Sequence, residues 1–125
     1  SDGVIMGAQG GHPDIADGAK LRIITAPLVR KNFPIVRDKV TTVVTPGQDI
    51  DVIVTDKGIS INPLRTDLME KLKNTNLPLK DIHELKEEAE AVTGKPAMPE
   101  YGDEIVGIVE ARDGSIMDVV RRVIK

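Results

Sequence analysis

A glycine-rich loop is the part of the sequence whose residue types and spacing favour chemistry. It runs Gly7-Ala8-Gln9-Gly10-Gly11-His12-Pro13-Asp14. Gly10 and Gly11 have no Cβ, so their backbone can come close to a ligand. N–H groups that point into a cleft can bind an oxyanion, a carboxylate or a phosphate. The pattern predicts anion binding, and a plain tight turn is the alternative interpretation.

His12 adds a titratable side chain to this loop. An imidazole can donate a hydrogen bond to a substrate carboxylate or take part in proton transfer. The alternative is a loop histidine satisfied by the backbone. The loop lacks the Gly-Lys-Ser/Thr of a P-loop and the spacing of a dinucleotide fingerprint. These two classes of nucleotide site are therefore not predicted.

The other chemistry-bearing residues favour structural roles. His83 lies off the apolar stripe of a predicted helix and is expected to be a solvated surface residue. No pair of histidines has metal-ligand spacing, so we predict no metal site. Three aspartates lack the spacing of a calcium loop, and two serines lack a partner base. These residues are Asp49, Asp51, Asp56, Ser60 and Ser115.

Short elements must position the loop. Residues 4–6 form a brief apolar run before it, residues 15–19 have the length of one helical turn, and residues 21–26 favour a strand closed by Pro27. This order is the minimum for a parallel βαβ unit. Further strands are predicted over residues 33–36, 40–45, 51–55 and 59–62, of which 40–45 is β-branched throughout.

Two helices and a hairpin complete the prediction. Thr66 can cap the first helix, which is followed by a short extended run at 77–79. Asp81 can cap the second helix, and Gly94 would end it. The second helix carries an apolar stripe of Ile82, Leu85, Ala89 and Val92. Residues 105–111 and 116–123 flank an Asp113-Gly114 turn, a strong hairpin signal. The predicted fold class is α/β, with a mixed, mostly parallel sheet flanked by helices and a C-terminal β-hairpin.

Composition limits the possible functions. The 125 residues are 40% hydrophobic and 30% charged, with a net charge of -3, no cysteine and only 2% aromatic residues. We expect an aliphatic core, no disulfide and no nucleic-acid footprint. No apolar run approaches the ~20 residues of a transmembrane helix. A length of 125 residues suits a single domain or part of a larger one, and the start at Ser1 rather than Met indicates a fragment. We therefore expect residues 1–125 to be a single domain or a fragment of a larger one.

The chain resembles the alpha subunits of citrate lyase along nearly its whole length. The matching stretches are residues 1–14, 40–47, 51–56, 58–59, 62–63, 77–79, 93–96, 113–114 and 118–121. The resemblance implies the last quarter of such a subunit, part of a coenzyme A transferase-like α/β domain. It also implies a cytoplasmic citrate:acyl carrier protein transferase, which exchanges acetyl for citrate on a thioester and releases acetate.

Partners and site residues follow from the same resemblance. The partners are the rest of the alpha subunit, the beta subunit and the gamma subunit, an acyl carrier protein whose prosthetic group, or coenzyme A, supplies the thioester. Neither a cofactor of this chain's own nor a membrane is implied. Gly10, Gly11 and His12 would bind substrate. The glutamate motif of many coenzyme A transferases is not in this chain, so no catalytic residue is assigned, and we expect the chain alone to be inactive.

Two other functions stay open from the residues alone. One is a coenzyme A transferase or acyl-coenzyme A thioesterase relative that uses a different acid. The other is a non-catalytic binding module that kept the fold. A citrate lyase alpha subunit should use citrate as its best acceptor acid, whereas the transferase or thioesterase relative should use citrate poorly. A binding module should show no thioester exchange even when the rest of the subunit is restored.

Overall fold

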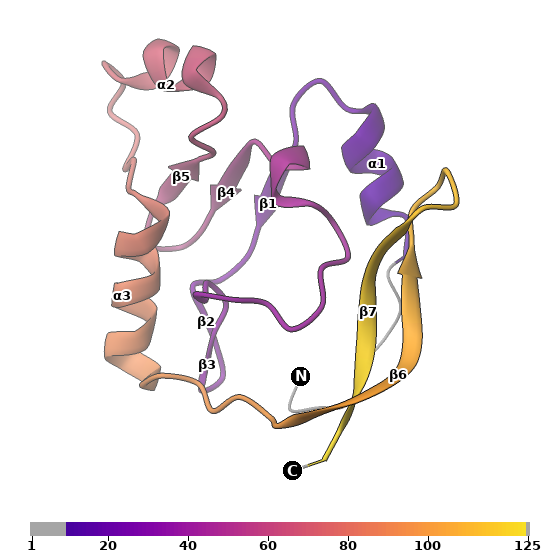
Figure 1. Cartoon of the computed structure of the whole chain (residues 1–125). Helices are drawn as coiled ribbons and strands as arrows, with labels where there is room; N and C mark the ends of the chain where they lie inside the picture. Colours follow the sequence, from indigo (N-terminus) through magenta and orange to yellow (C-terminus); the bar gives the residue numbers. More distant parts are fainter. Residues whose placement is uncertain (1–9, 125) are drawn as a thin grey trace. The chain divides into compact units, whose positions relative to one another are not determined.

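The computed structural model describes residues 10–124, which divide between two compact units (Figure 1). The first unit contains the described parts of Ser1–Ala19, Val40–Pro46 and Ala97–Lys125. The second contains Lys20–Lys39 and Gly47–Pro96. Each unit is described by itself. The expectation of a single domain or fragment stays a prediction.

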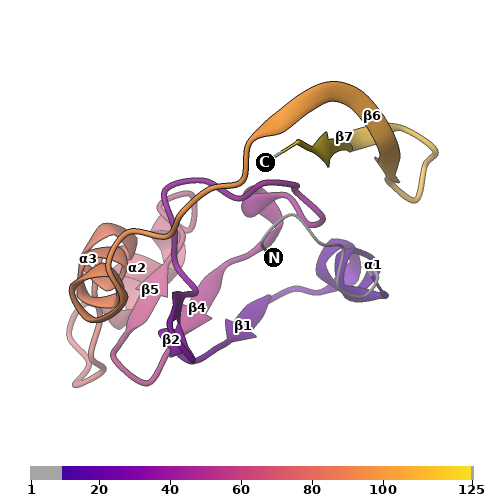
Figure 2. The ribbon, with the colours of Figure 1, turned by 90° about the horizontal axis from the view of Figure 1, so that it is seen from below.

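A three-stranded sheet organises the second unit. Its strands are β1 (Ile23–Thr25), β4 (Val52–Val54) and β5 (Ile59–Ile61), in the order β1-β4-β5 (Figure 2). Strand β4 pairs in parallel with β1, Ile24 opposite Ile53, and antiparallel with β5, Ile53 opposite Ser60. The turn after β4 is tightened by the Thr55 hydroxyl, which accepts the Gly58 N–H at 3.0 Å. The predicted strands at 21–26, 51–55 and 59–62 are confirmed, each shorter than expected.

The prediction of a mostly parallel sheet is wrong for the described residues. Of the named strand pairs, β1 with β4 is parallel and the other three are antiparallel. An isolated parallel bridge also joins Ile59 to Leu79, within the extended run predicted at 77–79. One antiparallel pair is β2 (Val29–Arg30) with β3 (Phe33–Pro34), the latter within the predicted strand 33–36. Tight turns bring consecutive strands together antiparallel, whereas parallel pairing needs a long crossover. The predicted strand at 4–6 lies outside the described residues.

Helix α3 (Ile82–Thr93) supplies the core of the second unit. The Asp81 side chain caps it by accepting the His83 N–H at 2.8 Å, and Gly94 ends it with φ +73°. Leu85 and Ala89 are fully buried against Leu28, the residue directly before β2. Both predicted caps of this helix are confirmed, and the core there is aliphatic as expected.

The apolar stripe of α3 is narrower than predicted. Val92 is 77% exposed, so it does not join Leu85 and Ala89 in the core. The core against which α3 packs contains Leu28, with Val29, Val36 and Ile82 half-buried around it. Helix α2 (Thr66–Leu72) forms where expected, but its N-cap position is Arg65, without a side-chain cap.

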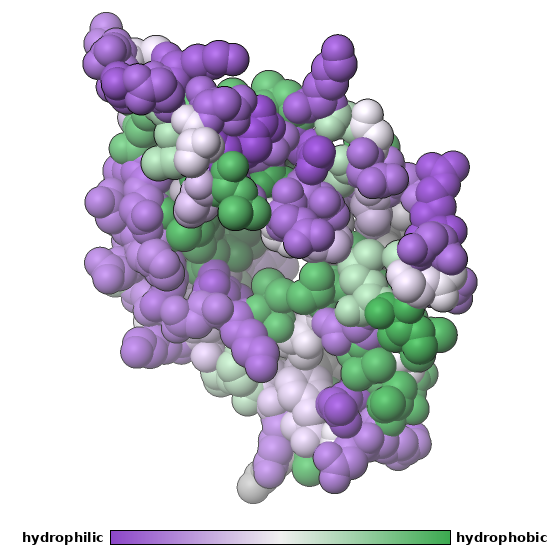
Figure 3. Space-filling view, turned by 45° about the horizontal axis from the view of Figure 1, so that its top comes forward, coloured by the Kyte–Doolittle hydropathy of each residue, from purple (hydrophilic) through white to green (hydrophobic). Residues whose placement is uncertain are grey.

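The first unit holds helix α1 (His12–Gly18) and the hairpin of β6 (Tyr101–Glu110) and β7 (Ile116–Val123). The predicted hairpin is confirmed: Asp113 accepts the Ser115 N–H at 2.9 Å, and Gly114 has φ +85°. Apolar side chains stay exposed on the hairpin, as the hydrophobic surface at the lower right of Figure 3 shows. They include Ile105, Ile108 and Ile116.

Candidate functional site

Helix α1 begins immediately after the glycine pair. It starts at His12, three residues before the predicted start, because Pro13 fits the first turn and the Gly11 carbonyl accepts the Ile15 N–H at 3.0 Å. Gly10 has φ +64°, a left-handed conformation that favours glycine. Gly11 has φ -87°, which any residue adopts. Residues 1–9, the first part of the loop motif, lie outside the described residues.

Both glycines are exposed. Apart from the chain neighbours of each glycine, no described residue lies within 4 Å of a Cβ built at Gly10 or Gly11. The backbone conformation explains glycine at position 10. Neither conformation nor packing against a described residue explains it at position 11. Close approach of a ligand to the backbone at Gly11 stays a prediction from the sequence.

His12 is placed by a residue far away in the sequence. Its side chain is exposed, and its Nδ1 lies 2.8 Å from Oγ1 of Thr45. The alternative interpretation is a loop histidine whose side chain is satisfied by the backbone. The partner found here is instead the side chain of Thr45. The structure brings Gly10, Gly11 and His12 together as consecutive residues at the start of α1 and adds Thr45 to them.

The segment that carries Thr45 is not the strand predicted at 40–45. Within residues 10–124, positions 40–46 are not part of a strand, and the N–H of Val43 donates to Oδ2 of Asp118 at 2.7 Å. The Tyr101 hydroxyl donates to Oγ1 of Thr41 at 3.3 Å. A β-branched run favours an extended chain, but strand formation requires a neighbour for its backbone groups. Here, side chains of the hairpin take that place.

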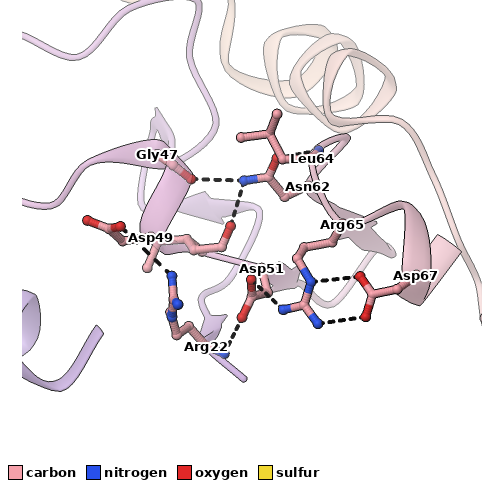
Figure 4. A network of polar contacts seen from close by, with 9 residues as sticks. Arg22, Gly47, Asp49, Asp51, Asn62, Leu64, Arg65 and Asp67 are labelled. Carbon is pink, nitrogen blue, oxygen red and sulfur yellow. Dashed lines mark hydrogen bonds and ion pairs between the residues drawn. The ribbon is translucent and has the colours of Figure 1, made fainter. Parts of the chain in front are cut away.

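A second polar cluster lies in the other unit and is built around Asp51 (Figure 4). The Asp51 side chain is 3% exposed; it accepts the Arg22 N–H at 2.8 Å and lies 2.7 Å from Nη1 of Arg65. Arg65 also binds Asp67 through Nε and Nη2, at 2.8 and 2.9 Å. The Asn62 side chain donates to the Ile50 carbonyl at 2.7 Å.

These contacts shift the pKa values of both carboxyl groups. Burial alone would raise the pKa of Asp51, but the hydrogen bonds from Arg65 and Arg22 and the two guanidinium charges together hold it below its ordinary value. The hydrogen bonds from Arg65 lower the pKa of Asp67 to about 2. The cluster joins β4 to the start of α2, so we assign it a structural role.

Other candidates add no further site. His83 is exposed at the start of α3, which confirms the predicted surface position. Among residues 10–124, no group of three or more His, Asp or Glu side chains is arranged to hold a metal ion. Within the same residues, no helix has the length and apolar character needed to cross a membrane.

Sequence reasoning missed Thr45, Asp118 and the partners of Asp51. Thr45 stands in a Thr-Pro-Gly sequence that indicated only a turn. Asp51, directly before the apolar run of β4, was a signal of a buried carboxylate that needs a cation nearby. Contacts to Arg65 and His12 span 14 and 33 residues, and no local pattern encodes them.

The fold and the loop define a small mixed α/β protein with a glycine-rich loop ahead of a short helix. The family model for the citrate lyase alpha subunit matches residues 1–123. The chain is 54% identical over 123 residues to the citrate lyase alpha chain of Klebsiella pneumoniae, and 50% identical to that of Haemophilus influenzae. The chain belongs to the citrate lyase alpha subunit family.

A solved structure agrees with this assignment. It is described as the alpha subunit of citrate lyase from Streptococcus mutans in complex with citrate. Its TM-score to this chain is 0.94 at 52% identity, over 99% of this chain and 24% of that one. The two curated relatives are each matched over 98% of this chain and 24% and 25% of their own lengths. The chain therefore spans about a quarter of the relatives that it resembles.

Proposed function

We propose that this chain is part of a citrate:acyl carrier protein transferase, also described as a citrate CoA-transferase. The proposed reaction exchanges acetyl for citrate on the thioester of an acyl carrier protein or coenzyme A. A citrate carboxylate attacks the acetyl thioester, the thiolate leaves, and a mixed anhydride of the two acids forms. The thiolate then attacks the citryl carbonyl, and acetate leaves. The observation that carries this proposal is the family match over residues 1–123.

The glycine pair supports the binding part of the proposal. The exposed backbone at Gly10 and Gly11 suits the contact with a citrate carboxylate or with the oxyanion that develops at the thioester carbon. Fixed N–H donors need no reorganisation when this charge appears. His12, with Nδ1 held by Thr45, presents its other ring nitrogen to the same substrate.

The remaining parts of the machinery lie beyond this chain. Because the chain spans about a quarter of its relatives, we place the rest of the active site on the rest of the alpha subunit. We propose that this chain is the C-terminal quarter of a coenzyme A transferase-like subunit. Its proposed partners are a beta subunit that cleaves citryl thioester and a gamma subunit that is the acyl carrier protein, all in the cytoplasm.

The proposal is tested by acetate release from acetyl-coenzyme A when citrate is added. The assay compares this chain alone with the full-length subunit, and citrate with other di- and tricarboxylic acids. Citrate-dependent release by the full-length subunit only is the expected result. Release without an acceptor acid would identify a thioesterase, and a better acid than citrate would identify another transferase. No release from either protein would leave a binding module.

A further inference from the structure

The contact between His12 and Thr45 joins two segments of the first unit that are 33 residues apart. Nδ1 and Oγ1 lie 2.8 Å apart. A hydrogen bond to one ring nitrogen of histidine fixes which nitrogen carries the proton and which way the ring faces. The threonine hydroxyl can donate to Nδ1. In that arrangement Nε2 carries the ring proton and is the donor left for another molecule.

Thr45 is itself held in place by the hairpin. Two residues before it, the Val43 N–H donates to Asp118 Oδ2 at 2.7 Å. The other oxygen of that carboxylate accepts the Val119 N–H, also at 2.7 Å. The Tyr101 hydroxyl reaches Thr41 at the start of the same segment. Strands β6 and β7 therefore hold the segment at Thr41 and Val43, and Thr45 lies two residues after the second contact.

The hairpin also reaches the helix that carries His12. Nη1 of Arg112, in the hairpin turn, lies 3.9 Å from Oδ1 of Asp14 in the first turn of α1. This pair is exposed and adds little stability alone. The pair helps to position α1, because through it the hairpin contacts the helix that carries His12. The hairpin also contacts the segment that carries Thr45, so it holds both partners of the hydrogen bond.

We propose that Thr45 is a positioning residue for His12. Its hydroxyl donates to Nδ1 and keeps the proton on Nε2, which then donates to the carboxylate of the bound acid. A carboxylate only accepts hydrogen bonds, so this tautomer is the productive one for a neutral imidazole. The inference rests on the proposed function, which identifies the bound acid as citrate. It assigns to Thr45 the control of the tautomer of the His12 ring.

The kinetic test uses variants of the full-length subunit. Thr45→Val removes the hydroxyl at nearly constant volume, and Thr45→Ser keeps it. We expect Thr45→Val to lower kcat/KM for citrate by about tenfold, as for the loss of one orienting hydrogen bond. Thr45→Ser should retain most of the activity. Thr42→Val, the same change three residues earlier, is the matched control and should match the parent.

A double variant asks whether Thr45 acts through His12. If it does, His12→Gln with Thr45→Val loses no more activity than His12→Gln alone. Two losses that multiply would overturn the proposal. Equal losses in Thr45→Val and Thr45→Ser would also overturn it, because only the hydroxyl is assigned the role.

A spectroscopic readout separates this inference from the proposed function. The subunit is labelled with 15N-histidine, and the His12 signals are identified by their loss in His12→Gln. We expect the parent to show protonated Nε2 and unprotonated Nδ1, and Thr45→Val to shift toward a mixture of tautomers. Unchanged signals in Thr45→Val would overturn the positioning role. A shift with full activity in His12→Gln would uphold the positioning and overturn the role of His12 toward the acid.

Discussion

Asp51 and Arg65 form an ion pair of 2.7 Å in which the carboxylate is 3% exposed and the guanidinium side chain 26% exposed. The same carboxylate accepts the backbone N–H of Arg22, one residue away from the start of the β1–β4 pairing at Ile23. A single buried side chain thus ties β1 to the entrance of α2. Removing its charge leaves the Arg65 guanidinium with one ionic partner fewer and loosens the connection to α2.

We expect Asp51→Asn to lower the local stability of the second unit by about 1–3 kcal/mol. The amide oxygen can still accept from Arg22, but the charge that pairs with Arg65 is lost. Hydrogen–deuterium exchange of the amides in β4 and β5 of the full-length subunit measures this, with rates rising about tenfold or more. The control is Asp49→Asn, whose half-buried pair with Arg22 spans a longer distance of 3.8 Å. Equal effects of the two changes would contradict the structural role of Asp51.

Asp67 predicts a dependence of stability on acid pH. Its folded-state pKa of about 2 lies below the ordinary value of 3.8, so its stabilising effect is present above pH 3.8 and is lost as the pH falls toward 2. Asp67→Asn should therefore lower the unfolding temperature near neutral pH, and the deficit should shrink between about pH 4 and pH 2.

The cause of this shift can be tested separately. In an Arg65→Gln background the Asp67 carboxyl loses the largest cause of its lowered pKa and keeps the smaller effects of the Leu68 N–H and the Lys71 charge, so its pKa should return toward the ordinary value. The pH-dependent effect of Asp67→Asn on the unfolding temperature should then be much smaller. A deficit that persists in this background would mean that another group causes the shift.

Gly11→Ala tests the close approach of substrate at the glycine pair. The backbone there suits any residue, and no described residue would meet the added methyl group. We expect helix α1 to form and the transferase activity of the full-length subunit to fall by about tenfold or more, because the methyl group blocks the backbone donors. Gly18→Ala, at the other end of α1, is the matched control. Equal activity of both variants would show that substrate does not approach Gly11.

Leu85→Ala and Val92→Ala test the width of the buried stripe on α3. Leu85 is fully buried, so its truncation should cost about 2–5 kcal/mol. Val92 is 77% exposed, and its truncation should stay within about 0.5 kcal/mol. Exchange rates of the α3 amides in the full-length subunit compare the two. A large effect at Val92 would mean that another part of the subunit covers this face.

The sequence alone determined the elements whose signals are local. The Asp81 cap, Gly94 and the Asp113-Gly114 turn act within a few residues, so they were predicted at the right positions. The glycine-rich loop before a helix was predicted for the same reason. The family resemblance was also present in the sequence, and the family match confirmed it.

Tertiary structure decided what depends on distant partners. The β-branched run at 40–45 is not a strand in the part of the chain that the structure describes, and Asp118 and Tyr101, both far away in the sequence, bind Val43 and Thr41 of this run. Val92 lies outside the core that Leu28 forms with Leu85 and Ala89. Strand β4 pairs with β5 antiparallel because a short turn joins them. The partner of His12 lies 33 residues away. Propensity acts along the chain, whereas these outcomes depend on which segments meet in space.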